Sequence, residues 1–102
     1  MYAVLRLNSF DPDKLAAASD RIGEFDSIHS AQPGYVGSVV VEVEGGRRFV
    51  LNLWESAEHS SAALSILGPA VKGLLGPLML GPSELIGVGT VISSDLVPTT
   101  GA

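Results

Sequence analysis

Apolar and polar residues follow one another along this chain in a characteristic order of short segments. Residues 2–8 alternate between the two kinds, which is typical of a strand. A helical repeat follows over 15–29, then two apolar runs within 39–54, a second helical pattern from 57, and a last alternating segment over 85–92. This order predicts a ferredoxin-like βαββαβ chain of the α+β class, a four-stranded antiparallel sheet with helices on one face.

The first helix is predicted from its start signal and its apolar stripe. Asp11 supplies an N-cap carboxylate and Pro12 suits the first helical position. The glycine after Pro33 then turns the chain toward the next strand. Spacings of three and four residues place one buried stripe on a single helix, made by Leu15, Ala18, Ile22, Phe25 and His29.

A pair of glycines marks the turn of a hairpin. Gly45 and Gly46 suit the positive φ angles of a two-residue turn. With only these two residues in the loop, Val39 would face Asn52 in the neighbouring strand. The second strand of the hairpin then has two different faces, with Phe49, Leu51 and Leu53 on one and Val50, Asn52 and Trp54 on the other.

The second helix has a clear start and a broken end. Ser56 is a suitable N-cap. We expect the helix to run to about residue 67, because a proline disfavours helical geometry in the residue before it and Pro69 follows. The apolar Gly-Pro segment 68–82 could form a lid over a cavity, with Leu75 and Met79 as ligand contacts, or only a kinked helix that closes the core.

Composition predicts one domain with an uncovered apolar surface. The chain has 102 residues, of which 46% are hydrophobic and 17% charged. We assign residues 1–95 to the domain and 96–102 to a C-terminal tail. A sheet covered by helices on one face leaves the other face bare, and a second copy of the chain is the usual cover. The composition therefore predicts a homodimer.

Charge and residue usage exclude several classes of function. The net charge of −5 and the absence of a basic stripe argue against nucleic-acid binding. The chain has no cysteine, so thiol nucleophiles, disulfides and cysteine-ligated metals are excluded. Arg6 and Asn8 interrupt the first apolar run, and Lys72 interrupts the longest one. We therefore expect no signal peptide and no membrane span, and a cytoplasmic protein.

Four side chains on one sheet face are the candidate site. Arg6, Asn8, Asn52 and Trp54 can share a face if the first and third strands are neighbours, and buried arginine and asparagine need partners. One interpretation is a pocket between sheet and helices, in which polar groups polarise a ligand and Trp54 stacks on it. The alternative is polar strand ends satisfied by loop backbone, with the tryptophan packed at the edge of the core.

The two histidines carry little signal by themselves. Either could serve as a general base, since imidazole titrates near neutrality. However, His29 falls in the last turn of its helix, where positive charge is favourable, and His59 falls in the first turn of the next one. A structural or surface role is favoured for both, with His59 kept as a candidate ligand contact. Their separation gives no metal signature. Ser60, Ser61 and Ser65 are expected on the helix surface.

Three segments resemble the antibiotic biosynthesis monooxygenase domain of the dimeric α+β barrel superfamily. They are residues 32–35, the valine-rich hairpin, and residues 53–59 leading into the second helix. The resemblance implies a homodimer whose sheets pack face to face and a ligand cavity between each sheet and its helices. Members of that family include cofactor-independent oxygenases of polyaromatic phenols, quinol oxygenases and haem-degrading enzymes.

The resemblance also implies roles for particular residues. Haem degraders carry an asparagine that is similar to Asn8, but they also use an iron-ligating histidine in the second helix. Here that stretch contains residues 71–73 and no histidine, which argues against haem cleavage, so no cofactor is expected. Asn52 and Trp54 are similar in kind to residues of the cofactor-free oxygenases. In such chemistry Arg6 could hold a substrate oxyanion, to which Asn52 or Asn8 donates hydrogen bonds.

Three hypotheses are consistent with the sequence. The first is a cofactor-independent monooxygenase acting on an aromatic or quinol-type molecule. The second is a non-catalytic dimeric protein that binds a hydrophobic ligand, which a cavity of leucine, valine and glycine alone would favour. The third is an isomerase or lactone-processing enzyme on the same scaffold, which a paired histidine or carboxylate in the cavity would favour. Polar anchors beside Trp54 would favour the oxygenase.

Overall fold

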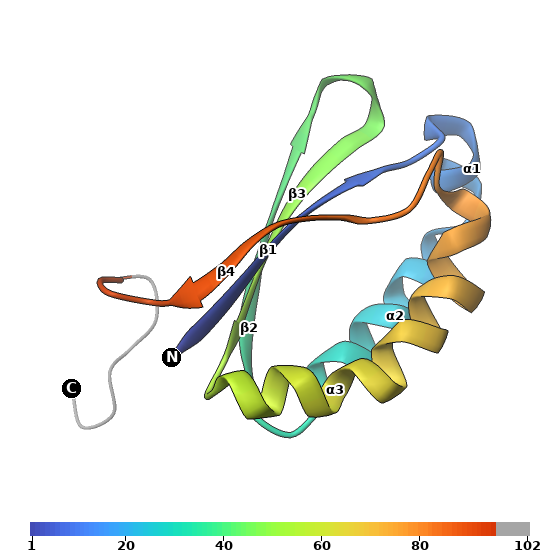
Figure 1. Cartoon of the computed structure of the whole chain (residues 1–102). Helices are drawn as coiled ribbons and strands as arrows, with labels where there is room; N and C mark the ends of the chain where they lie inside the picture. The colour runs from blue at the N-terminus through green and yellow to red at the C-terminus, as the bar shows by residue number, and fades with distance from the viewer. Residues whose placement is uncertain (96–102) are drawn as a thin grey trace.

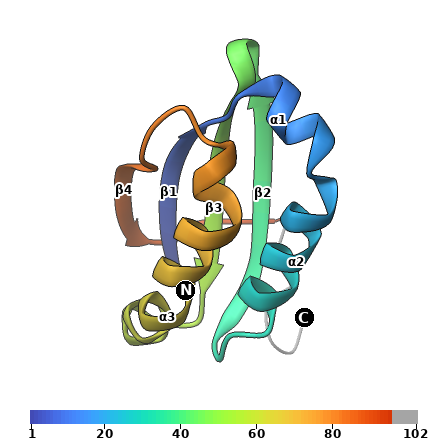
Figure 2. The ribbon, with the colours of Figure 1, turned by 90° about the vertical axis from the view of Figure 1, so that its right-hand side faces the viewer.

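The computed structural model describes residues 1–95 and contains one antiparallel sheet with helices on one face (Figures 1 and 2). The strand order is β2-β3-β1-β4. This confirms the predicted α+β, ferredoxin-like fold and the pairing of the first and third strands. The predicted tail lies outside the described residues. The strands are β1 (Tyr2–Ser9), β2 (Tyr35–Val43), β3 (Arg47–Trp54) and β4 (Glu84–Thr90), and the helices are α1 (Pro12–Ala17), α2 (Ser19–Ser30) and α3 (Ala57–Ala70).

The first helical region is two helices, so the prediction of a single helix was wrong. Its start is as expected, because Asp11 Oδ1 accepts hydrogen bonds from the backbone N–H groups of Asp13 and Lys14 at 3.0 and 3.2 Å. Ala18 separates α1 from α2 with non-helical angles, φ −132° and ψ 37°. The apolar stripe nevertheless faces inward along both helices, and it ends in His29, which is buried.

The hairpin turn has three residues, so the predicted two-residue turn was wrong. Glu44–Gly46 forms a short 3-10 turn, and both glycines have φ of +76°. The Gly46 carbonyl accepts a hydrogen bond from the Phe10 backbone N–H at 2.9 Å, which ties the turn to the end of β1. The extra loop residue shifts the register by one position. Ser38, and not Val39, therefore lies opposite Asn52.

Helix α3 is longer than predicted. Ser56 caps it by accepting a hydrogen bond from the His59 backbone N–H at 3.2 Å, but the helix continues through Pro69 to residue 70. A π turn (Val71–Leu75) and a 3-10 turn (Gly76–Leu78) extend it further. Burial of apolar side chains on both sides of the proline offsets the helical hydrogen bond that the proline removes. The segment closes the core, which is one of the two roles expected for it.

The same helical stretch meets the length and composition of a membrane span. Ala57–Leu78 has 22 residues and a mean hydropathy of 1.3 over its most apolar window, of which 22% is buried. A core helix of a soluble protein passes the same test, and α3 packs on the sheet through Ala63 and Leu67. The absence of a membrane span therefore stays a prediction.

The core consists of two clusters at the two ends of β1. Near its start, Val4 and Trp54 pack against the inner face of α3. Just beyond its end, Phe10 packs against Leu75 and Leu78. Between these clusters, β1 presents polar side chains to the helices. This gap in the core is where the candidate site lies.

The opposite face of the sheet has no helix over it in Figure 1. Leu5, Leu51 and Val39 lie side by side across three strands, as do Leu7, Phe49 and Val41. The valines of β2 on this face are 41% and 51% exposed. The predicted uncovered apolar face is therefore present in the single chain.

Candidate functional site

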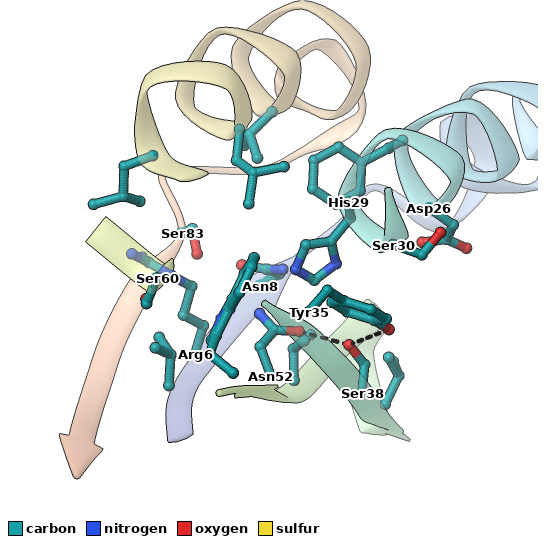
Figure 3. Close-up of a pocket in the computed structure, with 18 of the residues that line it drawn as sticks. Arg6, Asn8, Asp26, His29, Ser30, Tyr35, Ser38, Asn52, Ser60 and Ser83 are labelled. Carbon is teal, nitrogen blue, oxygen red and sulfur yellow. Dashed lines mark hydrogen bonds between the residues drawn. The ribbon is translucent and has the colours of Figure 1, made fainter. Parts of the chain in front are cut away.

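A cavity of about 840 Å³ lies between the sheet and the helices. This volume is in the range of small-molecule sites in proteins. Its walls are the helix-facing side chains of all four strands together with residues of α2 and α3, and its lining mixes apolar and polar groups (Figure 3). The cavity is thus not the purely aliphatic one that would favour a simple hydrophobic binder.

The four residues that the sequence placed on one sheet face all line this cavity. Arg6 and Asn8 come from β1, and Asn52 and Trp54 come from β3. In the ladder between these strands, Val4 lies opposite Asn52 and Tyr2 opposite Trp54, so alternate residues of both strands face the helices. Strand pairing therefore brings together the candidates predicted from residue alternation.

The other three predicted contacts lie elsewhere. His59 Nδ1 is 2.7 Å from Ser56 Oγ, and its Nε2 is 3.8 Å from a carboxylate oxygen of Glu55. Its ring also packs against Gly34, where φ is +78° and a Cβ atom would collide with the imidazole. Leu75 and Met79 pack around Phe10 in the second core cluster. The structure thus places these three side chains outside the lining of the cavity.

The Asn52 amide is held in one orientation by a chain of hydroxyl groups. Its Oδ1 accepts a hydrogen bond from Ser38 Oγ at 2.8 Å. Because the Ser38 proton is used in this way, the Tyr35 hydroxyl, 3.1 Å from Ser38 Oγ, is the donor in the second link. Figure 3 shows the amide oxygen turned toward Ser38 and the nitrogen turned away from it. The Asn52 NH₂ group is therefore available as a preorganised donor to a ligand.

His29 is a buried titratable group of the cavity. Only 7% of the residue is exposed, and its ring lies 4.9 Å from the Tyr35 ring and 5.6 Å from the rings of both Phe25 and Trp54. Desolvation lowers the pKa of His29, and the nearby Asp26 carboxylate opposes this in part. The imidazole is thus neutral at physiological pH and able to accept a proton. The burial of His29 agrees with its place in the predicted apolar stripe, but a structural role was favoured because the stripe does not reveal the cavity beside the ring.

A polar corner lies farther along β1. Asn8 Oδ1 and Ser83 Oγ are buried atoms without a hydrogen-bond partner, and both residues line the cavity. Arg6, half-buried beside them on the cavity face of β1, has no ion pair among residues 1–95. Arg48, the other arginine of the cavity, is paired at 3.2 Å with Glu42. The corner therefore holds hydrogen-bonding capacity and positive charge that the described residues do not satisfy.

Sequence reasoning missed several polar residues of the lining. Ser60 and Ser61, expected on the helix surface, also line the cavity; Ser61 and Ser65 are exposed as expected. Ser38 was missed because the predicted register of the hairpin placed Val39, and not Ser38, opposite Asn52. Ser83 had no signal at all, since it lies in the irregular connection before β4. Within residues 1–95, no group of three or more histidine, aspartate or glutamate side chains is arranged to hold a metal ion.

Comparison with known proteins identifies the fold. No protein-family model matches the sequence, and no curated protein is significantly similar to it. A structure of a protein of unknown function from Nitrosomonas europaea superposes with a TM-score of 0.76 at 14% identity, covering 96% of this chain and 94% of the other. A candidate antibiotic biosynthesis monooxygenase from Caulobacter crescentus gives 0.73 at 16%, with 90% of each chain covered.

An oxygenase is among the similar structures. A variant of SnoaB, a cofactor-independent oxygenase from Streptomyces nogalater, superposes with a TM-score of 0.72 at 15% identity, covering 92% of this chain and 95% of the other. Similarity at these identities concerns the fold. The fold that the sequence resemblance implied is thus confirmed: this chain has the architecture of antibiotic biosynthesis monooxygenase proteins.

Proposed function

We propose that this protein is a cofactor-independent monooxygenase that oxidises an aromatic or quinol-type molecule in the cavity. The observation that carries the proposal is the position of His29, a buried neutral base within a cavity that also contains the Trp54 ring and the oriented Asn52 amide. Similarity in fold to a cofactor-independent oxygenase supports the same class of reaction.

The reaction requires a substrate whose carbanion is electron-rich enough to reduce oxygen. His29 removes a proton from an activated CH₂ group, and the electron pair delocalises onto the substrate oxygen as an enolate or phenolate. Electron transfer to O₂ and recombination give a peroxide at the same carbon. Protonation and loss of water then break the O–O bond and leave a carbonyl group. In total, the CH₂ group and O₂ become C=O and H₂O.

Asn52 and Trp54 have separate parts in this scheme. The Asn52 NH₂ group donates a hydrogen bond to the oxygen on which charge develops, and its orientation is set in advance by Ser38. Trp54, next to His29, forms an apolar wall for the substrate rings. Water exclusion by the helices strengthens the hydrogen bond to the developing negative charge.

Oxygen uptake tests the proposal directly. Purified protein is expected to accelerate oxygen consumption by anthrone-type or hydroquinone compounds. For the anthrone-type compounds, whose activated CH₂ group becomes C=O, one O₂ is consumed for each carbonyl group formed. Consumption is measured with an oxygen electrode and the product by mass spectrometry with ¹⁸O₂. The absence of any acceleration over buffer across both compound classes would contradict an oxygenase and leave the isomerase and binding-protein hypotheses.

A proton-transfer isomerase is the second candidate, because His29 and the Asp26 carboxylate both line the cavity. The two reactions share the first step and differ in the fate of the carbanion. An isomerase returns the proton to another position of the substrate and needs no oxygen. Turnover under nitrogen, with deuterium from solvent incorporated into the product, would favour the isomerase over the oxygenase.

We also propose that the active form is a homodimer joined through the bare sheet face. The apolar side chains of this face, among them Leu5, Leu51 and Val41, are partly exposed in the single chain, and a matching sheet would cover them. Light scattering at micromolar concentration is expected to give twice the mass of the chain, which is 10.5 kDa. A monomer at this concentration would contradict the pairing.

A further inference from the structure

We propose that the substrate carries a carboxylate group, which binds Arg6 in the polar corner formed with Asn8 and Ser83. The inference rests on the proposed function only for the aromatic body of the ligand, which occupies the region of His29 and Trp54. The carboxylate is a second feature of the substrate, distinct from the oxygen that Asn52 contacts.

The charge of Arg6 is the first reason. A guanidinium group is permanently charged, and a partly buried one without a counter-ion is costly. The other charged or titratable groups that line the cavity include Arg48, Asp26 and His29. Arg48 is already paired with Glu42 at 3.2 Å and lies 5.6 Å from the centre of the Phe10 ring. Arg6 is thus the unpaired cation of the cavity among residues 1–95.

The neighbouring polar atoms are the second reason. Asn8 follows Arg6 by two residues, on the same face of β1. Leu7 pairs with Glu84, so Ser83, one residue earlier, comes next to Asn8 across the β1–β4 edge. Buried polar groups in proteins nearly always have partners, yet Asn8 Oδ1 and Ser83 Oγ have none in the described structure. By rotation of its amide Asn8 can present NH₂ instead of oxygen, and the Ser83 hydroxyl can donate.

The number and type of donors favour a carboxylate over a phosphate. One guanidinium group presents a planar fork that matches the two oxygens of a carboxylate. Two neutral groups beside it can complete the contacts to a single negative charge. A dianionic phosphate would call for a second free cation, and no other unpaired arginine or lysine lines the cavity among residues 1–95.

The position of the corner sets the shape of the ligand. Arg6 lies four residues along β1 from Tyr2, which pairs with Trp54 beside His29. Four residues of a strand span roughly 13 Å between Cα atoms. A fused-ring aromatic acid fits this arrangement, with its acidic group at one end and its reactive carbon near His29.

Calorimetric titration with 2-naphthoate and 2-naphthamide tests the inference, because the two probes match in size and differ in charge. The naphthoate is expected to bind about tenfold more tightly than the naphthamide, as for a charge-assisted hydrogen-bonded pair. Arg6→Gln should reduce this preference to within about twofold, and Arg6→Lys, which keeps the charge but not the planar fork, should retain only part of it. Arg47→Gln, at the exposed hairpin end, is the matched control and should change neither affinity.

The outcomes separate this inference from the proposed function. Equal affinity for the two probes, or an equal loss of both affinities in Arg6→Gln, would overturn the carboxylate site while leaving an aromatic cavity in place. Binding of neither probe would overturn the carboxylate site and also count against the aromatic cavity on which the proposed function depends. Thermal melting of each variant shows whether a loss of binding reflects the site or the fold.

Discussion

Replacing His29 by glutamine is expected to lower the turnover of the proposed oxygenation about a hundredfold or more, the usual contribution of a general base. Glutamine retains a polar group near the position of the imidazole but cannot take the substrate proton at neutral pH. The matched control is His59→Gln. His59 is the other histidine of the chain and lies outside the cavity lining, so this variant should keep most of the activity. Initial rates of oxygen uptake at saturating substrate measure both effects.

The pH profile gives an independent check on the same residue. Burial lowers the pKa of His29 below its ordinary value of about 6.5, against the smaller opposing effect of Asp26. The active form is the neutral one, so turnover should be level at neutral pH and fall on acidification only below 6.5. Equal losses in the two histidine variants, or a full rate in His29→Gln, would contradict the assignment of His29 as the base.

Protein stability should follow the same titration. Between the lowered pKa and 6.5, the unfolded chain takes up a proton at His29 more readily than the folded protein does. The contribution of His29 to the free energy of unfolding therefore falls as the pH drops through this window and levels off below the folded-state pKa. This part of the acid destabilisation should be absent in His29→Gln.

Replacing Trp54 by alanine is expected to lower the free energy of unfolding by about 3–5 kcal/mol, the usual cost of removing a large aromatic side chain from a core. Trp54 is 2% exposed and packs with Val4, Ala63 and Leu67. A domain of this size has a total stability of about 5–15 kcal/mol, so the loss is a large fraction of it. Urea unfolding followed by circular dichroism measures the change, since the variant has no tryptophan fluorescence.

Two further variants separate the roles of Trp54. Trp54→Phe keeps an aromatic wall and should recover most of the stability and of the ligand affinity. Leu64→Ala removes an apolar side chain that lines the cavity but is half-exposed, so it should cost little stability. A loss below about 1 kcal/mol in Trp54→Ala would contradict its assignment to the core.

The sequence by itself determined the order of the elements, because each rests on local signals. Asp11 and Ser56 cap their helices through local hydrogen bonds, which do not depend on where the helices pack. A period of two residues places alternate side chains of a strand on one face. Pairing of the first and third strands then sufficed to predict that Arg6, Asn8, Asn52 and Trp54 share a face. A bare apolar sheet face followed from a single layer of helices.

Tertiary structure alone decided the chemistry of the cavity. The turn at residues 44–46 has one residue more than the predicted two-glycine turn, and Gly46 accepts a hydrogen bond from the Phe10 backbone at the end of β1. The resulting register places Ser38 beside Asn52. His29 is buried by ring contacts with Tyr35 and Trp54 from other elements, and that burial lowers its pKa. The helical spacing predicted that His29 is buried, but the register of the hairpin and the aromatic neighbours of His29 depend on contacts between residues far apart in sequence, so no local pattern encodes them.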